Sequence, residues 1–588
     1  MRYLAVATDY DGTLAHDGSV DTTTVQALER ARASGRKLIM VTGRELEDLM
    51  KVFPRVDLFD RIVAENGALL YRPAAREEKL LCDPYPPRFV QMLRDKGVFP
   101  LSAGRAIIAT VEPYEKQALE AIHELGLELH VVFNKGSVMV LPSGINKATG
   151  LKSALDELGL SAHNVVGVGD AENDHAFLSA SGCAAAVANA LPALKERADI
   201  VTRAARGAGV TELIDRLLAD DLVGVAARLN RHAVLVGKRP DGAEERIDPM
   251  ATNFLVAGTS GSGKSTVTTG ILERLCDASY QYAIIDPEGD YTTLEDAVVV
   301  GDARREPSVQ EMVDVLKKPG ENVVVNLLGV PLEERPRYFR ELLPRVLEMR
   351  ARTGRPHLIV VDEVHHMLPA ARGPEPVAPP PSTGMLYITV HPASVDPAVL
   401  APVGVLLVTG QSPEVTVSDF SNTAGRQVPL VDPQPLGPGE VLLWRPGSGL
   451  DAVRIQSEPP RAERRRHSRK YAEGNLGPDR NFVFTGPAGK LNLRAQNLAV
   501  FLQMAGGVDD ETWLYHLRRG DYSDWFRKEI KDEELANEAA DIEGQADPLP
   551  PAETRAALRA AVERRYTLPA DKASGEVTPS SERGASAK

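Results

Sequence analysis

Short apolar runs recur along most of the chain, and many of them end in a polar or acidic side chain. In the first part of the chain these runs cover residues 3–8, 37–41, 61–64 and 164–168. Runs that are apolar on both faces are typical of strands buried in a parallel sheet. A helix is expected from Asp21, which can cap it, to Ser34, because Gly35 then stops it. The alternation predicts an α/β fold with polar residues at the carboxyl ends of its strands.

A second group of apolar runs follows, and it predicts another mostly parallel sheet. The runs cover 254–257, 283–286, 323–327, 357–361, 386–390 and 405–408. The first leads into the glycine-rich stretch 258–265, and a helical segment, 266–276, comes next. A glycine-rich turn between a strand and a helix is typical of a P-loop, whose backbone N–H groups wrap a phosphate.

The P-loop predicts a site for ATP and Mg²⁺. Lys264 would reach the β- and γ-phosphates, and the Ser265 hydroxyl would hold Mg²⁺. Asp362-Glu363 follows the run 357–361, as in a Walker B motif, so that Asp362 would join the Mg²⁺ shell and Glu363 would polarise the attacking water. The residues expected to bind the nucleotide are Gly258, Ser260, Gly261, Ser262, Gly263, Lys264, Ser265 and Thr266.

Residues 223–458 resemble the HerA/FtsK-type hexameric ATPases, which implies a RecA-like fold and assembly into a homo-oligomer. The resemblance lies in the approach to the P-loop, 235–248, and in the stretch Asp286-Pro287-Glu288-Gly289-Asp290-Tyr291. In that family the strand after Walker B commonly ends in Thr-Gln, whereas His391 stands here, and the proline-rich segment 373–381 replaces a usual helix. His391 could sense the γ-phosphate or be structural, and Arg426 is a candidate arginine finger.

The polar residues at strand ends in the first part of the chain form an ordered set of four motifs. They are Asp9-Tyr10-Asp11-Gly12-Thr13-Leu14, Thr42-Gly43-Arg44, Lys147, and Gly169-Asp170-Ala171-Glu172-Asn173-Asp174. This set resembles the haloacid dehalogenase superfamily of phosphatases, in the Cof and phosphoglycolate-phosphatase-like branch that carries an α/β cap. The resemblance implies a Rossmann-like core.

The same resemblance assigns roles to the motif residues. Asp9 would be the nucleophile that forms an aspartyl-phosphate, and Asp11 would protonate the leaving oxygen and later activate water. Thr42 and Lys147 would bind the phosphoryl group. Mg²⁺ would be held by Asp9, the Asp11 carbonyl, Asp170 and Asp174. Glu65 and Asn173 could take part or could merely brace loops.

Residues 78–142 interrupt the regular alternation of strands and helices and are expected to form the cap. Helices are predicted at 87–96 and 113–125, and strands at 106–111 and 138–141. A cap excludes water and contacts the part of a substrate that is not phosphate. Arg105, Lys135 and Ser137 are candidates for that contact, with an ordinary solvated surface as the alternative.

Length and composition set the domain count and the class of protein. At 588 residues the chain exceeds one core, and we expect a hydrolase domain at 1–222 with core segments 1–77 and 143–222, then 223–458, 459–550 and 551–588. A net charge of −14 argues against bulk nucleic-acid coating. Three distant cysteines give neither a disulfide framework nor a zinc knuckle, and the absence of an 18-residue apolar span predicts a cytoplasmic protein without membrane contact.

The C-terminal part should be a basic linker, a small helical domain, and a tail that is disordered from residue 570 onward. Arg461, Arg464, Arg465, Arg466, Arg469 and Lys470 form the only dense basic run, which could grip a phosphate backbone or be a solvated linker. Helices are predicted at 491–505, 511–517 and 522–530, around an aromatic core.

The leading hypothesis is a Mg²⁺-dependent phosphomonoester hydrolase that acts on a small phosphorylated metabolite and is fused to an ATPase. Two alternatives stay open. One is a nucleic-acid translocase with an accessory phosphatase, and the other is an ATP-dependent assembly or regulatory switch. Nucleic acid is possible as a partner but is not favoured.

Overall fold

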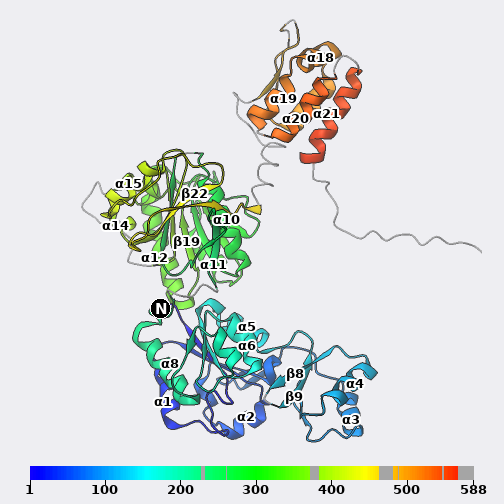
Figure 1. Cartoon of the computed structure of the whole chain (residues 1–588), viewed down its shortest axis with the longest axis vertical. Helices are drawn as coiled ribbons and strands as arrows, with labels where there is room; N and C mark the ends of the chain where they lie inside the picture. Colours follow the sequence, from blue (N-terminus) through cyan, green and yellow to red (C-terminus); the bar gives the residue numbers. More distant parts are fainter. Residues whose placement is uncertain are drawn as a thin grey trace, which may run out of the picture. The chain divides into compact units, whose positions relative to one another are not determined.

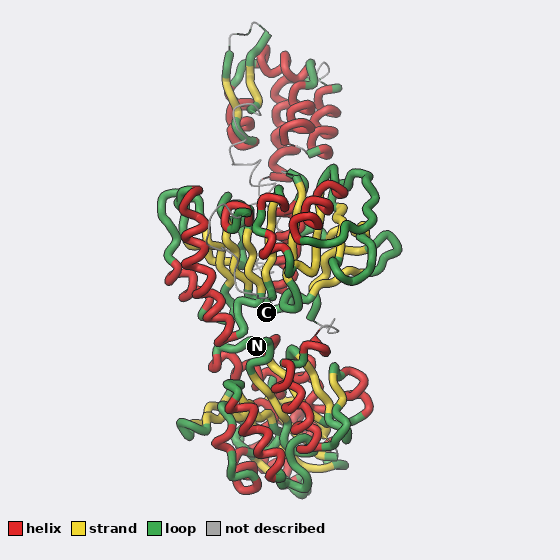
Figure 2. Tube along the Cα trace, turned by 90° about the vertical axis from the view of Figure 1, so that its left-hand side faces the viewer, coloured by secondary structure: helices red, strands yellow, loops and turns green. Residues whose placement is uncertain are grey.

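The computed structural model describes residues 1–134, 136–226, 232–259, 261–370, 383–461, 481–487, 489, 491–530, 532–545 and 549–566. It divides into two compact units, Met1–Pro459 and Pro460–Lys588 (Figure 1). The first unit contains two large sheets and a small one, and the second contains a two-stranded sheet with a group of helices (Figure 2). The mixed α/β class predicted from the sequence is confirmed.

The first large sheet has eight strands in the order β12-β11-β10-β1-β2-β3-β4-β5. The six strands from β12 to β3 run parallel, and β4 and β5 continue the sheet antiparallel. The strands are β1 Ala5–Thr8, β2 Lys37–Val41, β3 Arg61–Ala64, β4 Leu69–Arg72, β5 Glu77–Leu80, β10 Val165–Gly169, β11 Cys183–Ala186 and β12 Ile200–Val201. The predicted strands at 3–8, 37–41, 61–64 and 164–168 therefore become β1, β2, β3 and β10.

Helices pack against this sheet and close its core. Asp21 caps α1 as expected, since its carboxylate accepts the Thr24 N–H at 2.8 Å. The helices are α1 Thr22–Ala33, α2 Leu46–Val52, α5 Lys147–Leu158, α6 His175–Ala180, α7 Pro192–Arg197, α8 Arg206–Asp220 and α9 Val223–Ala226. Short 3₁₀ turns lie at η1 Val56–Leu58, η2 Glu65–Gly67, η3 Ala162–Asn164 and η4 Glu172–Asp174.

A four-stranded antiparallel sheet with two helices forms the inserted cap. Its order is β6-β7-β9-β8, and its elements are α3 Pro87–Asp95, β6 Ser102–Ala103, β7 Ile108–Val111, α4 Glu115–Leu125, β8 Leu129–Asn134 and β9 Ser137–Pro142. Its core gathers Phe89, Leu93, Ile108 and Val140. The expected cap start at residue 78 falls inside β5, which pairs with β4 in the large sheet.

The second large sheet has eleven strands in the order β14-β13-β23-β22-β21-β15-β20-β19-β16-β18-β17. The seven strands from β21 to β17 are parallel, and the other four extend the sheet antiparallel. The strands are β13 Val234–Lys238, β14 Glu244–Ile247, β15 Asn253–Gly258, β16 Tyr282–Asp286, β17 Ala297–Val300, β18 Asn322–Asn326, β19 Leu358–Val361, β20 Met385–Thr389, β21 Val403–Thr409, β22 Glu440–Trp444 and β23 Val453–Ser457.

The helices of this region are α10 Lys264–Asp277, α11 Val309–Leu316, α12 Arg335–Thr353, α13 Val364–Met367, α14 Pro397–Leu400 and α15 Pro413–Ala424, with 3₁₀ turns η5 Leu332–Glu334 and η6 Pro392–Ser394. The strand order places β15, which leads into α10, beside β20 and β21 at the centre of the sheet. All six apolar runs predicted as strands are strands. The antiparallel extension and β17 were not predicted.

Buried contacts join the two large-sheet regions of the first unit. Arg2 forms an ion pair with Asp248 at 2.8 Å, and both side chains are largely buried. His163, in η3 just before β10, donates from Nε2 to the Ala278 carbonyl just after α10, at 2.8 Å. Its ring stacks on that of Tyr280, with centroids 3.7 Å apart. The end of the P-loop helix is thereby tied to the start of the strand that leads to Asp170.

The second unit packs an aromatic core between a hairpin and helices. Its elements are β24 Phe482–Phe484, β25 Leu493–Ala495, α17 Leu498–Gly507, α18 Asp510–Arg518, α19 Asp521–Trp525, a π-helical turn Phe526–Ile530, α20 Glu533–Glu543 and α21 Pro551–Tyr566. The helix predicted from residue 491 begins instead at Leu498, because Asn497 caps it and β25 precedes it. No helix among the described residues is long and apolar enough to cross a membrane.

Candidate active sites

Three carboxylates and one ammonium meet at the carboxyl edge of the first sheet. Asp9 follows β1, Asp170 follows β10, and Asp174 ends η4. Each of the three offers an oxygen, and these oxygens lie within 4.8 Å of one another in a buried cluster. Lys147, at the first position of α5, donates from Nζ to Asp9 Oδ1 and to Asp174 Oδ1, both at 2.6 Å. The four residues come from three separate segments of the chain, so only the folded sheet brings them together.

The electrostatics of this cluster are dominated by burial and by an excess of negative charge. Burial and the Asp174 carboxylate raise the pKa of Asp9 despite the opposing effect of Lys147. Burial lowers the pKa of Lys147, but the carboxylates of Asp174 and Asp9 outweigh it, and the net pKa is raised. Three carboxylates and one ammonium leave a deficit of positive charge. Hard oxygen donors with such a deficit fit Mg²⁺.

The carboxylates of the cluster are held by further hydrogen bonds. Asp174 Oδ2 accepts the backbone N–H groups of Asp170 and Ala171 at 2.8 and 2.9 Å. Thr13 Oγ1 donates to Asp170 Oδ1 at 3.2 Å, and Asn189 Nδ2 lies 3.4 Å from Asp170 Oδ2. Neither Thr13 nor Asn189 was predicted at the site. Thr13 is part of the first motif and could have been inferred, whereas nothing in the sequence around Asn189 indicates it.

The Asp11 side chain pairs with Arg44. Its carboxylate accepts Arg44 Nε at 2.7 Å and Nη2 at 2.8 Å. Arg44 also bonds Asp48, and these carboxylates raise its pKa above the usual value. A bidentate contact of this kind fixes both partners in orientation. The sequence singled out Arg44 only as part of its motif, and the pairing with Asp11 is a finding of the structure.

Thr42 is buried at the end of β2, next to the strand that carries Asp9. Its Oγ1 accepts the Arg44 N–H at 3.1 Å, and its backbone carbonyl accepts the N–H of Asn66 at 3.0 Å. Asn66 in turn accepts from Asn173 Nδ2 at 3.1 Å. Thr42 and Asn173 therefore border the same strand edge as the carboxylate cluster.

The three residues proposed for substrate contact in the cap have different surroundings. Arg105 is engaged with carboxylates outside the cap, at 3.1 Å from Glu47 and 3.3 Å from Glu78. Ser137 opens β9 and pairs with Val111 and Asn134 in the cap sheet. Lys135 lies outside the described residues.

The glycine-rich stretch lies between a strand, β15, and a helix, α10, as the sequence predicts. Lys264 starts α10 and donates from Nζ to the carbonyls of Gly258 and Thr259, both at 3.0 Å. Gly258 must be glycine, because a Cβ there would lie 2.2 Å from the Thr409 carbonyl oxygen. Ser262 bonds Thr409 through their hydroxyls at 2.7 Å.

The other residues of the predicted nucleotide site surround this turn. Gly261 and Gly263 have φ values of 73° and 97°, and Thr266 lies in the first turn of α10. Ser265 Oγ donates to Asp290 Oδ2 at 3.3 Å, so a residue of the stretch 286–291 reaches the expected Mg²⁺ position. Ser260 lies outside the described residues.

The Walker B pair lies at the end of β19, beside β16 and β20. Asp362 is buried, and burial together with Glu363 and Asp286 raises its pKa well above the usual value. Glu363 has a φ of 42°, a strained conformation for a residue with a side chain. Its Oε2 lies 3.4 Å from His365 Nδ1 and accepts no hydrogen bond among the described residues. A strained, poorly satisfied carboxylate beside Lys264 is consistent with a catalytic position.

His391 and Arg426 are the two further candidates that the sequence offers in this region. The His391 ring lies near that of His365, with centroids 6.2 Å apart. The backbone N–H of His391 donates to Thr389 Oγ1 at 3.1 Å. Arg426 donates from Nη2 to the Ala401 carbonyl of its own chain at 2.7 Å. Of the basic run, only Arg461 lies within the described residues.

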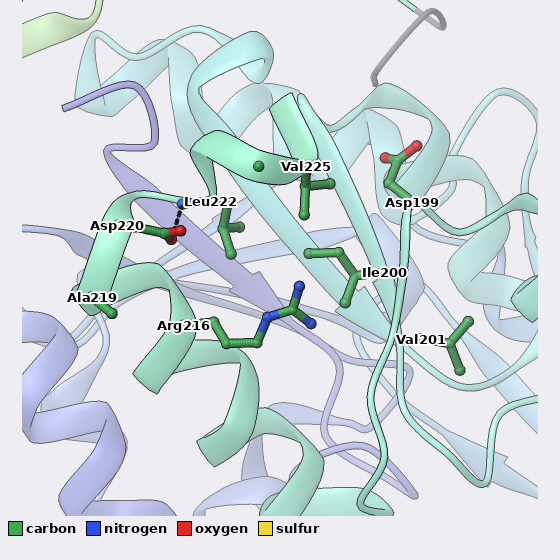
Figure 3. A pocket seen from close by; sticks show the side chains of 9 residues that line it. Asp199, Ile200, Val201, Arg216, Ala219, Asp220, Leu222 and Val225 are labelled. Carbon is green, nitrogen blue, oxygen red and sulfur yellow. Dashed lines mark hydrogen bonds between the residues drawn. The ribbon is translucent and has the colours of Figure 1, made fainter. Parts of the chain in front are cut away.

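A pocket of about 520 Å³ lies away from both of these sites, at the β12 edge of the first sheet (Figure 3). Ile200, Val201 and Val225 line it together with Arg216 of α8. Figure 3 shows the Arg216 side chain extending toward Ile200. The pocket contains none of the residues of the four motifs.

Comparison with known proteins gives a family match in each of the two large-sheet regions. A family model described as haloacid dehalogenase-like hydrolase matches residues 6–95 and 105–214. A second model, described as the central domain of helicase HerA, matches residues 246–341.

Individual relatives match the first region over nearly their whole length. The phosphoglycolate phosphatase of Methanothermobacter thermautotrophicus is 30% identical over 223 residues, which is 36% of this chain and 98% of that protein. Phosphoglycolate phosphatase 2 of Saccharolobus solfataricus is 31% identical over 221 residues, which is 37% of this chain and 93% of that protein. A solved haloacid dehalogenase-like hydrolase from B. subtilis is 18% identical with a TM-score of 0.32, covering 36% of this chain and 99% of that one. The phosphoglycolate phosphatase relatives and the two family models show that the chain belongs to the haloacid dehalogenase-like hydrolases, as a phosphatase joined to a HerA-type P-loop ATPase domain.

Proposed function

We propose that the first domain hydrolyses a small phosphomonoester through an aspartyl-phosphate on Asp9. The observation that carries this proposal is the buried cluster in which Lys147 Nζ bridges Asp9 and Asp174 at 2.6 Å beside Asp170. A carboxylate can attack an anionic phosphate only where positive charge cancels their repulsion; Lys147 supplies part of that charge, and Mg²⁺ held by the carboxylates would supply the rest.

In the first half of the reaction, a carboxylate oxygen of Asp9 attacks phosphorus, and the bond from phosphorus to the leaving oxygen breaks. Asp11 gives its proton to that oxygen, and the alcohol leaves. In the structure both carboxylate oxygens of Asp11 accept a hydrogen bond from Arg44. To act as the acid, Asp11 must therefore take up a proton and release one of its two hydrogen bonds to Arg44.

In the second half, Asp11 takes a proton from water, and the resulting hydroxide attacks phosphorus. Phosphate leaves and the Asp9 carboxylate is restored. Lys147 and Thr42 hold the phosphoryl oxygens in both halves. Asp9, Asp170, Asp174 and the Asp11 carbonyl would hold Mg²⁺, which supplies charge neutralisation at the phosphoryl group when bound.

The names of the relatives suggest a substrate class. Phosphoglycolate phosphatases match the domain over nearly their whole length, so 2-phosphoglycolate and other small phosphorylated acids are the first candidates. The cap closes the site against larger molecules. The test is phosphate release from a panel of phosphomonoesters, with Mg²⁺ and with excess chelator. We expect release from at least one small phosphate only with Mg²⁺, and no release from any of them would contradict the proposal.

For the second domain we propose ATP hydrolysis within a homo-oligomer. The support is the placement of Lys264 and Ser265 at the start of α10, which follows β15, and of Asp362 and Glu363 after β19, which only β20 separates from β15 in the sheet. The phosphates of ATP would replace the carbonyls that Lys264 now contacts, and Glu363 would polarise the attacking water. Mg²⁺ would be held by Ser265 and Asp362. Phosphate release from ATP by the purified chain, together with its mass in solution with and without ATP, tests both statements.

A further inference from the structure

The turn after β3 contains a buried carboxylate that the proposed mechanism does not use. Glu65 begins η2, has a φ of 51°, and is 1% exposed. Its Oε1 accepts the backbone N–H of Arg105 at 2.8 Å, and its Oε2 accepts those of Ala106 and Ile107 at 2.7 and 3.0 Å. These three donors belong to the cap loop between β6 and β7. Glu65 therefore binds the core to the cap through three charge-assisted hydrogen bonds.

The cap loop is shaped to receive this carboxylate. A Cβ on Gly104 would lie 2.8 Å from the Glu65 carboxylate carbon and Oε1, closer than real contacts. Tyr85 donates its hydroxyl to the Gly104 carbonyl at 2.5 Å and so holds the loop from the cap side. The loop can therefore receive the Glu65 carboxylate only with glycine at position 104.

The same turn contacts the segments that carry the phosphatase motifs. The Asn66 N–H donates to the Thr42 carbonyl at 3.0 Å, and its side chain accepts from Asn173 at 3.1 Å. Gly67 has a φ of 111°, and a Cβ there would lie 2.0 Å from the carbonyl oxygen of Asn146, which caps α5. Three catalytic segments and the cap thus meet at three consecutive residues.

We propose that Glu65 is a positioning residue that docks the cap over the phosphatase site, and that its turn links the docked cap to the phosphoryl-binding residues. This inference rests on the proposed function. Substrate entry under the cap breaks the three hydrogen bonds to Glu65, and closure forms them again. Closure orders the part of the substrate that is not phosphate, so the docking acts on specificity more than on the chemical step.

Two variants disturb this contact in different ways, and a third serves as a control. Glu65→Gln turns an amide N–H₂ toward backbone donors, and Gly104→Ala leaves Glu65 in place but pushes its carboxylate away. The control is Glu47→Gln, which removes the Arg105 contact across the same seam. Glu47 is 70% exposed, and exposed ion pairs contribute little.

The readouts are steady-state kinetics of the full chain and hydrogen exchange of the cap loop. We expect the KM for 2-phosphoglycolate to rise at least about tenfold in Glu65→Gln and Gly104→Ala. The KM for p-nitrophenyl phosphate, which has no carboxylate for the cap to order, should change less than about threefold. Exchange at the amides of 105–107 should accelerate at least about tenfold in both variants and not in Glu47→Gln.

Unchanged exchange and unchanged KM in both variants would overturn the proposal. Equal rises in KM for both phosphates, together with a lower unfolding temperature, would also overturn it. They would show that Glu65 stabilises the fold in general and does not act on the substrate through the cap. If the unaltered chain hydrolyses neither phosphate, the proposed function fails by itself. Hydrogen exchange at the amides of 105–107 then still tests whether Glu65 docks the cap, because that measurement requires no enzymatic activity.

Discussion

The ammonium of Lys147 lies 2.6 Å from Oδ1 of Asp9, and both side chains are buried at the carboxyl edge of the first sheet. The two residues are 138 positions apart in the chain. Asp174 shares the same ammonium. Removing this cation would leave the carboxylates uncompensated in a medium that solvates charge poorly.

Lys147→Met is therefore expected to lower kcat/KM for phosphate release at least about 100-fold, because the phosphoryl group loses its fixed positive partner. The matched control is Lys152→Met, on the same helix, where the side chain is 76% exposed. Steady-state assays with an aryl phosphate and Mg²⁺ test this. Similar losses in both variants would show that the helix, and not the ammonium at 147, is responsible.

Stability should depend on pH through His163. Burial and the neighbouring His232 lower its pKa from 6.5 to about 4. Between these values the unfolded chain takes up a proton that the folded chain excludes, so stability falls as pH falls from 6.5 toward 4. The shift corresponds to about 3 kcal/mol.

His163→Gln should flatten this dependence relative to the unaltered chain, whereas His16→Gln, at an exposed position, should not. Urea unfolding of the full chain at several pH values, monitored by circular dichroism, gives the comparison. If the free energy of unfolding depended on pH identically in the unaltered chain and in both variants, the interpretation of His163 as a buried neutral residue would be contradicted.

The two active sites should be independent in their chemistry, because they use different folds. Lys264→Ala and Glu363→Gln are expected to abolish ATP hydrolysis while aryl phosphate hydrolysis persists. Both activities are measured on the same preparations. Loss of both in folded Lys264→Ala protein would show coupling, for which the contact of His163 with the end of α10 offers a physical route.

The ATPase is expected to rise less than about threefold when duplex or single-stranded DNA is added at low salt, where electrostatic binding is strongest. The chain has a net charge of −14, which opposes binding to a phosphate backbone, and His391 stands where HerA/FtsK-type motors commonly have glutamine. Turnover is measured across a salt series. A large, salt-sensitive stimulation that disappears when Arg464, Arg465 and Arg466 are neutralised would favour a nucleic-acid translocase instead.

Most residues of the two proposed sites could be predicted to lie close together because they occupy fixed places relative to strands. Asp9 and Asp170 follow apolar runs, Lys147 opens a helix, and Lys264 follows a glycine-rich turn. Such positions converge whenever the strands are parallel neighbours. These positions can be recognised in the sequence without knowledge of the strand order in the sheet.

The remaining contacts depend on tertiary packing and have no local signature. The Arg44 pairing with Asp11 and the Glu65 contact with residues 105–107 join segments tens of residues apart. The antiparallel strand β22 is five residues long, like β16 and β18, and its apolar run 441–444 could have been predicted, whereas β23 is apolar only at Val453 and Ile455. In the C-terminal unit, the sequence predicts a helix over the hairpin strand β25, because the residues of this strand adjoin the apolar start of α17.

The central claim is that Asp9 is the nucleophile of a phosphatase, and replacing its carboxylate tests it most directly. Asp9→Asn keeps the shape of the side chain and removes its negative charge, and Asp57→Asn, at an exposed position of the same domain, is the control. Phosphate release from p-nitrophenyl phosphate with Mg²⁺ is measured for both. The account predicts a loss of at least about 1000-fold for Asp9→Asn and less than about twofold for Asp57→Asn. Retention of more than about a tenth of the activity in Asp9→Asn would contradict it.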